Sequence, residues 1–305
     1  MPAVTPRVRR RYGNAPQGRE EMGDLRYERP GTVAEATALL AAGGATARVL
    51  AGGTDLVLAL RGGLPCDVLV DVKRIPELGR IAWTPAGGLE IGACVLVQDV
   101  AEDERIRRVL PALAEGAEAI GSLQIRCRAT VAGNLSNASP CMDTAPPLLV
   151  LDGQLRIAGS KGTREAPLAD FFLGVRRTAL AADELITAVV LPPPPQGLAS
   201  GFDKIKRSGG HDLAVVNAAA AWAPAAGTLR VAIGSCAVRP VLIPALEGVK
   251  PGADADATGA RLAERALAHI QPIDDVRGSA EYRREMTAAL CRRLARRLLG
   301  AGRAS

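Results

Sequence analysis

Residues 129–143 read Ala-Thr-Val-Ala-Gly-Asn-Leu-Ser-Asn-Ala-Ser-Pro-Cys-Met-Asp, a polar, turn-forming stretch between two apolar segments of helical character. Because Gly133 has no Cβ, another molecule can approach the main chain closely there. Successive backbone N–H groups in such a loop can form an anion-binding concavity. The stretch is almost free of positive charge, so it predicts a phosphate held by the backbone rather than by an arginine cluster. Its donors are Thr130, Gly133, Asn134, Ser136, Asn137 and Ser139.

A second loop, Ala51–Leu56, has the same chemistry and directly follows the apolar run Arg48-Val49-Leu50. Strand, glycine loop, helix and a further strand at 67–72 predict a parallel β-loop-α-β unit, with the loop at the carboxyl end of the first strand. Two interpretations of Thr54 are open: its hydroxyl donates to a phosphate at the helix N-terminus, or it only caps that helix. We expect the two loops to hold one dinucleotide between them.

Several catalytic classes lack their motifs in this chain. There is no Gly-x-x-x-x-Gly-Lys-Ser/Thr and no opening Gly-x-Gly-x-x-Gly, which disfavours a P-loop enzyme and a Rossmann domain. No Gly-x-Ser-x-Gly supports a hydrolase. The six cysteines include no Cys-x-x-Cys pair, and the only histidines are His211 and His269, so no metal ligand set is predicted. Asp143 either hydrogen-bonds a ribose hydroxyl or caps the next helix.

Composition predicts an ordinary globular protein with two domains, because the 305 residues are 48% hydrophobic and 23% charged. The net charge of +6 is concentrated at the two ends, away from the few aromatic residues, so nucleic-acid binding is disfavoured. No apolar run reaches the roughly 18–20 residues that span a bilayer, and no apolar segment follows the N-terminal arginines as in a signal peptide. Scattered free thiols suit a reducing compartment, and we expect a cytoplasmic protein.

The pattern along the chain predicts a flexible arm at 1–23 and then ordered structure. Thr32 is expected to cap a helix that ends at Gly43-Gly44. The proline run Pro192–Pro195 is the best candidate domain boundary, with strands followed by helices beyond it. Strands are expected at 47–50, 67–72, 81–83, 89–93, 154–158, 185–191, 201–207, 214–222 and 229–235. Helices are expected to begin at 54 or 55 and at 143 or 144, the latter with Pro146 and Pro147 in its first turn. Further helices are expected over 97–120, with a break at Pro111, and over 258–270 and 280–299.

Together these segments resemble the FAD-binding medium subunit of molybdenum hydroxylases, the group of the carbon monoxide dehydrogenase medium subunit and the xanthine dehydrogenase flavin domain. The likeness runs in order from Leu25 to the C-terminus. Its motifs are Ala51-Gly52-Gly53-Thr54-Asp55-Leu56, Ile125-Arg126-x-x-Ala129-Thr130-Val131-Ala132-Gly133-Asn134, Ser139-Pro140-x-x-Asp143, Lys204-x-x-Arg207, Asp212-x-Ala214 and Asp275-Val276-Arg277-Gly278-Ser279-Ala280-Glu281-Tyr282-Arg283-Arg284.

The resemblance implies an α+β fold: two α/β subdomains, about 24–78 and 79–195, form an FAD-binding domain of the vanillyl-alcohol-oxidase (PCMH) type. A C-terminal α+β domain, 196–305, would hold a small antiparallel sheet and a helical bundle. It also implies FAD as the cofactor, with no catalytic residue and no metal in this chain. The implied FAD contacts are Ala51, Gly52, Gly53, Thr54, Asp55 and Leu56 on one part of the pyrophosphate, Thr130, Ala132, Gly133 and Asn134 on the other, Ser139 close by, Asp143 at the ribityl or ribose, Leu180 at the adenine, and Lys204 and Leu213 near the flavin ring.

The resemblance further implies an electron-transfer subunit that works with a large molybdopterin subunit and a small subunit carrying two 2Fe–2S clusters, as a heterotrimer or a dimer of heterotrimers. Electrons would leave through FAD to NAD, a quinone or another acceptor. Ala132 stands where many relatives have glycine, and Leu213 replaces an aromatic residue of some. The iron–sulfur insertion of the hydroxybenzoyl-CoA reductase branch is missing. Two alternatives stay open: a stand-alone FAD oxidoreductase of the same fold, and a non-redox nucleotide-binding scaffold subunit.

Overall fold

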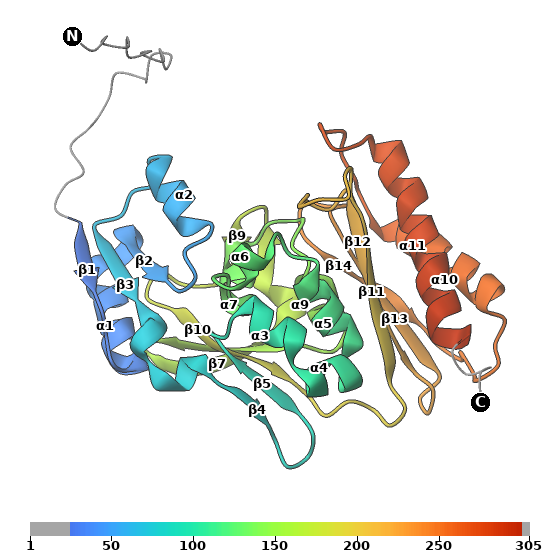
Figure 1. The fold of residues 1–305 in the computed structure, drawn as a ribbon, viewed down its shortest axis with the longest axis horizontal. Helices are drawn as coiled ribbons and strands as arrows, with labels where there is room; N and C mark the ends of the chain where they lie inside the picture. The colour runs from blue at the N-terminus through green and yellow to red at the C-terminus, as the bar shows by residue number, and fades with distance from the viewer. Residues whose placement is uncertain (1–24, 301–305) are drawn as a thin grey trace, which may run out of the picture.

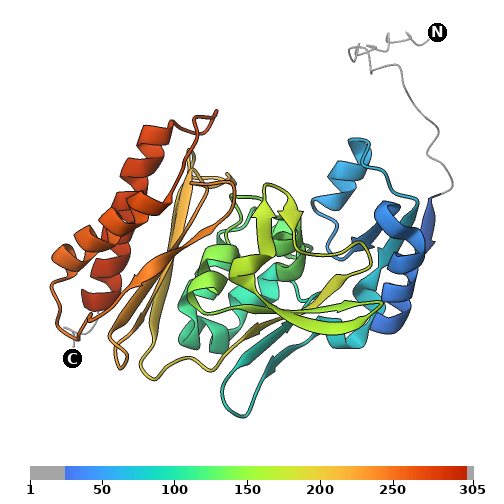
Figure 2. The same ribbon diagram turned by 180° about the vertical axis from the view of Figure 1, so that it is seen from behind.

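The computed structural model describes residues 25–300, and Figures 1 and 2 show three parts in a row along its long axis. The arm expected at 1–23 and the arginines within it lie outside the described residues. The first part contains β1 (Arg26–Glu28), α1 (Val33–Gly43), β2 (Ala47–Leu50), α2 (Leu56–Arg61) and β3 (Val68–Asp71), with short 3-10 turns at Gly44–Thr46, Val72–Arg74 and Pro76–Gly79.

A small parallel sheet in the order β1-β3-β2 forms this first part; the β-loop-α-β pattern predicts the pair β2 and β3, whereas β1 was not predicted. Helix α1 begins where expected because the Thr32 hydroxyl accepts a hydrogen bond from the amide of Glu35. It ends where Gly44 takes a φ of 56°, a value that favours glycine. Strand β2 runs parallel to β3, and the loop at 51–55 follows the carboxyl end of β2.

The middle part is built on an antiparallel sheet in the order β4-β5-β10-β6-β7, with helices packed beside it (Figure 1). Its strands are β4 (Ile81–Trp83), β5 (Leu89–Gly92), β6 (Gln154–Gly159), β7 (Gly162–Pro167), the pair β8 (Phe172–Gly174) and β9 (Arg177–Thr178), and β10 (Leu185–Leu191). Its helices are α3 (Val97–Glu102), α4 (Glu104–Val109), α5 (Pro111–Glu118), α6 (Leu123–Arg126), α7 (Val131–Asn137), α8 (Ala145–Val150) and α9 (Leu168–Phe171).

Prolines place two of these helices as expected, because proline is tolerated in a first turn that needs no donor. Pro111 is the first residue of α5, and Pro146 and Pro147 lie in the first turn of α8. The expectation of a turn-rich loop over 129–143 is wrong in part, because Val131–Asn137 forms helix α7. Thr130 is extended and caps this helix with its side chain, which offsets the poor helix propensity of a run with glycine and asparagine.

The C-terminal part is an antiparallel sheet in the order β11-β12-β13-β14, covered by two helices on its outer side (Figures 1 and 2). Its central strand β12 is buried on both faces: Ala219 and Ala221 belong to the core of the middle part, whereas Ala218 and Ala220 pack under the two helices. The α+β class expected from the sequence is confirmed. The elements are β11 (Ala199–Ile205), β12 (Val216–Ala223), β13 (Thr228–Gly234), β14 (Val241–Leu246), α10 (Ala255–His269) and α11 (Ala280–Gly300).

None of the helices in the described part of the chain, residues 25–300, combines the length and the hydrophobicity that a membrane-spanning helix requires.

Candidate functional site

The two loops singled out in the sequence meet at Gly52. A Cβ built on Gly52 would lie 2.0 Å from the carbonyl oxygen of Arg128 and 2.9 Å from the Cα of Ala129. Only glycine permits so close a backbone approach. The structure therefore brings the end of β2 directly against the segment that leads into α7.

The first loop offers a run of unengaged backbone donors. Within the part of the chain that the structure describes, the amides of Gly52, Gly53, Thr54 and Asp55 donate no hydrogen bond to protein. Gly53 has a φ of 75°, which turns the chain sharply before α2. Asp55, not Thr54, occupies the N-cap position of α2, and its side chain makes no capping bond. The interpretation of Thr54 as a helix cap is therefore wrong.

The second loop presents the first turn of α7. The Thr130 hydroxyl accepts a hydrogen bond of 3.0 Å from the amide of Gly133. The amide of Ala132 has no acceptor among residues 25–300, although the residue is buried, whereas the β-bridge between Leu96 and Thr130 places the amide of Val131 against the carbonyl of Val95. Unpaired buried amides are costly, which is why such groups commonly receive a ligand or water.

Hydrogen bonds inside the stretch 129–143 hold its side chains in place. The carboxamide oxygen of Asn134 accepts a hydrogen bond of 2.6 Å from the Thr144 hydroxyl, which joins α7 to the start of α8. The Ser139 hydroxyl accepts a bond of 3.3 Å from the amide of Cys141. Both side chains thus fix the loop, whatever else they contact.

Asp143 is buried in a charged pair rather than at a helix cap. Its Oδ2 lies 2.7 Å from the Nζ of Lys204 on β11, and its Oδ1 accepts a bond of 2.6 Å from the carboxamide of Asn217 on β12. Helix α8 has Thr144 in its N-cap position, with no side-chain capping bond, so the capping interpretation of Asp143 is wrong. Burial raises the pKa of Asp143, and the ammonium of Lys204 opposes that rise.

Lys204 also donates a bond of 3.1 Å to the carbonyl of Ala119, just after α5. The ammonium therefore ties the C-terminal sheet to two segments of the middle part. Leu180 is half-buried after β9 and packs on the core of that part, whereas Leu213 is 58% exposed after β11. Neither of these two leucines takes part in the contacts between the loops.

Asn217 is a site residue that sequence reasoning missed. Besides Asp143, its carboxamide donates a bond of 3.1 Å to the carbonyl of Met142, so it holds both residues of that segment. One signal was present: Asn217 is a single amide in the otherwise apolar run of β12, and buried polar groups need partners.

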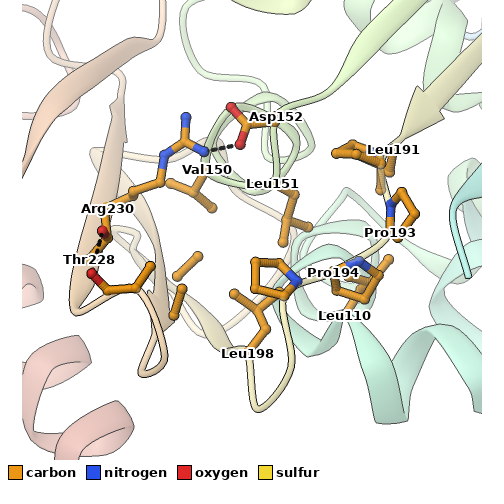
Figure 3. Close-up of a pocket in the computed structure, with 15 residues that line it drawn as sticks. Leu110, Val150, Leu151, Asp152, Leu191, Pro193, Pro194, Leu198, Thr228 and Arg230 are labelled. Atoms are coloured by element: carbon orange, nitrogen blue, oxygen red, sulfur yellow. Dashed lines mark hydrogen bonds and ion pairs between the residues drawn. The ribbon is translucent and has the colours of Figure 1, made fainter. Parts of the chain in front are cut away.

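A cavity of about 220 Å³ lies elsewhere, between the end of α8, the segment Pro192–Pro195 and strands β12 and β13. Figure 3 shows its apolar lining, with an ion pair between Arg230 and Asp152 at one side. None of the predicted site residues lines it. Leu198 in its wall is six positions from Lys204 along an extended strand, or roughly 20 Å. This cavity is therefore separate from the paired loops.

Comparison with protein families assigns both halves of the chain. Residues 21–194 match the family described as FAD binding domain in molybdopterin dehydrogenase, and residues 200–298 match the CO dehydrogenase flavoprotein C-terminal domain. The chain is 30% identical over 283 residues to the carbon monoxide dehydrogenase medium chain of Hydrogenophaga pseudoflava, covering 88% of this chain and 94% of that one. It is 30% identical over 274 residues to the xanthine dehydrogenase FAD-binding subunit of Escherichia coli O157:H7, with the same coverage.

Solved structures agree. Carbon monoxide dehydrogenase from Hydrogenophaga pseudoflava, in a form that lacks the Mo-pyranopterin moiety, superposes with a TM-score of 0.83 at 30% identity, covering 91% of this chain and 98% of that chain. Quinoline 2-oxidoreductase from Pseudomonas putida 86 gives a TM-score of 0.82 at 27% identity with the same coverage. The chain therefore belongs to the family of FAD-binding subunits of molybdenum hydroxylases, the oxidoreductase group of carbon monoxide dehydrogenase and xanthine dehydrogenase.

Proposed function

We propose that the two loops that meet at Gly52 hold the diphosphate of FAD, and that the chain passes electrons from a partner subunit to an external acceptor. The observation that carries this proposal is the contact of Gly52 with Arg128 and Ala129, which gathers the free amides of both loops on neighbouring segments. On this proposal Ala51 to Leu56 contact one part of the diphosphate, and Thr130, Ala132, Gly133 and Asn134 the other.

The donor set fits that group. A diphosphate presents several acceptor oxygens, and backbone amides at turns and helix starts are suited to receive them. The loop 51–55 supplies four such amides and the start of α7 supplies one, that of Ala132. Ala132 is 4% exposed, so its methyl group is already accommodated in the core and leaves its amide free for the ligand.

The remaining predicted contacts divide between the two ends of the cofactor. We propose Asp143 for a ribityl or ribose hydroxyl, with Ser139 close by, Leu180 for the adenine, and Lys204 and Leu213 for the ring. In this arrangement Asn217 and Lys204 hold the Asp143 carboxylate in one orientation. A carboxyl oxygen held in a fixed direction is well placed to accept a hydrogen bond from a hydroxyl group.

Redox chemistry belongs to the cofactor, which when bound can take up electrons singly and release them in pairs. The residues of this chain bind and orient it. Lys204 would favour negative charge on the ring by opposite-charge attraction, reduced by the neighbouring Asp143. A Lys204→Ala variant that binds FAD normally and keeps the same reduction potential would contradict this role.

The assembly that we propose is a complex with a large molybdopterin subunit and a small subunit carrying 2Fe–2S clusters, arranged as a heterotrimer or a dimer of heterotrimers. Electrons would enter from those clusters and leave to NAD, a quinone or another acceptor. We place the complex in the cytoplasm, because the six cysteines are all free thiols, as is usual in a reducing compartment.

The test begins with colour. The purified full chain should be yellow or become yellow with added FAD, and heating should release FAD that is identified by chromatography. A colourless chain that does not bind added FAD would favour the alternative of a non-redox scaffold subunit. For the electron route, the chain is purified with its co-expressed partner subunits and the clusters are reduced in a stopped-flow experiment. Flavin reduction that follows cluster oxidation supports the route, whereas substrate oxidation by the chain alone would support a stand-alone oxidoreductase.

A further inference from the structure

Lys73 lies beside the first loop although it belongs to the turn after β3. Its Nζ donates a hydrogen bond of 3.2 Å to the carbonyl oxygen of Ala51, the first residue of the loop. The same Nζ lies 2.7 Å from the Oδ1 of Asp71, the last residue of β3. One ammonium therefore connects the loop to the central strand of the parallel sheet.

Asp71 is a firm anchor for this ammonium. Its side chain is 6% exposed and accepts two further hydrogen bonds, from the Tyr27 hydroxyl on β1 and from the amide of Lys73. Burial alone would raise the pKa of Asp71, but the hydrogen bonds from Lys73 and Tyr27 outweigh it and lower that pKa. The carboxylate is thus ionised at neutral pH and held by groups from β1 and from the turn after β3.

The bond to Ala51 sets the direction of the next amide. In a planar trans peptide, the carbonyl oxygen and the following N–H point in opposite directions. Because Lys73 holds the oxygen of Ala51 on its own side, the N–H of Gly52 faces the other side of the loop. Gly52 is the residue at which the two loops meet, and its amide is one of the free donors.

We infer that Lys73 is a positioning residue for the dinucleotide, and that Tyr27, Asp71 and Lys73 form a unit that orients the amides of the first loop before the ligand arrives. The inference rests on the proposed function, since it needs the loop to bind a diphosphate. Donors that are already aligned lose less freedom on binding, so affinity rises without any contact between the unit and the ligand.

The unit predicts a distinctive effect on ligand binding. Replacing Lys73 by methionine keeps the length and apolar stem of the side chain but frees the Ala51 carbonyl. We expect FAD affinity to fall about tenfold, the loss that goes with one charge-assisted hydrogen bond. ADP, which carries the diphosphate, should lose a similar factor, whereas riboflavin, which has none, should bind unchanged.

The experiment titrates FAD, ADP and riboflavin into the flavin-depleted full chain and follows fluorescence. Lys73→Arg should restore affinity, because arginine can reach both oxygens. Lys161→Met, at an exposed lysine in the turn between β6 and β7, is the matched control. Asp71→Asn should weaken FAD as Lys73→Met does, and the double variant should lose no more than either single one, because the residues act as one unit.

The outcomes separate this inference from the proposed function. A wild-type chain that binds no FAD removes the function itself. A wild-type chain that binds FAD, with Lys73→Met binding equally well, overturns only the role of Lys73. Equal losses for FAD, ADP and riboflavin, together with a lower urea midpoint of the ligand-free chain and no rescue by arginine, would also overturn it, because they indicate a general loss of structure.

Discussion

Replacing Gly52 by alanine tests the meeting of the two loops most directly. The new methyl group would lie 2.0 Å from the carbonyl oxygen of Arg128, whereas ordinary contacts of a Cβ begin at about 3.4 Å and essentially none is found below 3.0 Å. The differences, 3.0 − 2.0 and 3.4 − 2.0, require the loops to separate by about 1.0 to 1.4 Å.

Moving the backbone of Arg128 away from Gly52 would cost free energy, because hydrogen bonds hold it in place. Its amide and that of Ala129 both donate to the carbonyl of Ile125, at 3.0 and 2.7 Å, which holds this segment at the end of α6. Overpacking of this kind costs about 1–3 kcal/mol in unfolding free energy. The two sets of amides would also no longer converge on one diphosphate, so we expect FAD affinity to fall at least about tenfold, beyond the loss of stability.

The assay is urea unfolding of the full chain with and without saturating FAD. A ligand that binds only the folded chain raises its stability by an amount set by its affinity, so the gap between the two curves reports binding. Gly52→Ala should lower the midpoint without FAD and narrow the gap. Gly79→Ala is the control, because a Cβ there meets nothing within 4 Å and no positive φ is required. If Gly52→Ala gave the same urea unfolding curves as the wild type, with and without FAD, the contact between the loops would be refuted.

Three further changes follow from the same geometry. Lys204→Met leaves Asp143 buried without its cation and should cost about 3–5 kcal/mol in urea unfolding, part of which Asp143→Asn should restore in the double variant. Hydrogen bonds from Arg277 lower the pKa of Asp275, so this carboxylate stabilises the folded state above its unfolded pKa of about 3.9. The unfolding free energy of the wild type should exceed that of Asp275→Asn by a constant amount above about pH 5, and this difference should shrink as the pH falls below about 4. Thermal unfolding of both proteins across this pH range measures it. Thr130→Ala removes the cap of α7 and should cost about 1 kcal/mol of unfolding free energy, whereas Thr130→Ser should retain most of it.

The sequence predicts well those elements whose signals are local. Thr32 and Gly44 bound α1 through a cap and a positive φ, and the last helix shows its apolar face directly. Strand β14 was missed because Pro244 interrupts it. The structure explains this, since β14 is the edge of its sheet, where proline removes no essential ladder bond.

Features that depend on distant partners could not be predicted in the same way. Asp143 precedes a helix, and nothing nearby in the sequence distinguishes a cap from an ion pair with Lys204, which lies 61 positions away. Lys73 contacts a loop 22 positions earlier only because β2 and β3 are parallel neighbours. Helix α7 was hidden for another reason: its small polar residues suit turns as well as helices, and the single local signal was the cap of Thr130.

The shared core of the middle and C-terminal parts bears on how the chain can be divided. Phe202, Ala219, Ala221 and Ala232 come from the last sheet, yet they complete the same core as the antiparallel sheet of the middle part. A fragment ending at Leu191 would expose that apolar face to water and strip Asp143 of its counter-charge. The halves are thus coupled in folding, and calorimetry should record a single cooperative melting event for the intact polypeptide rather than two.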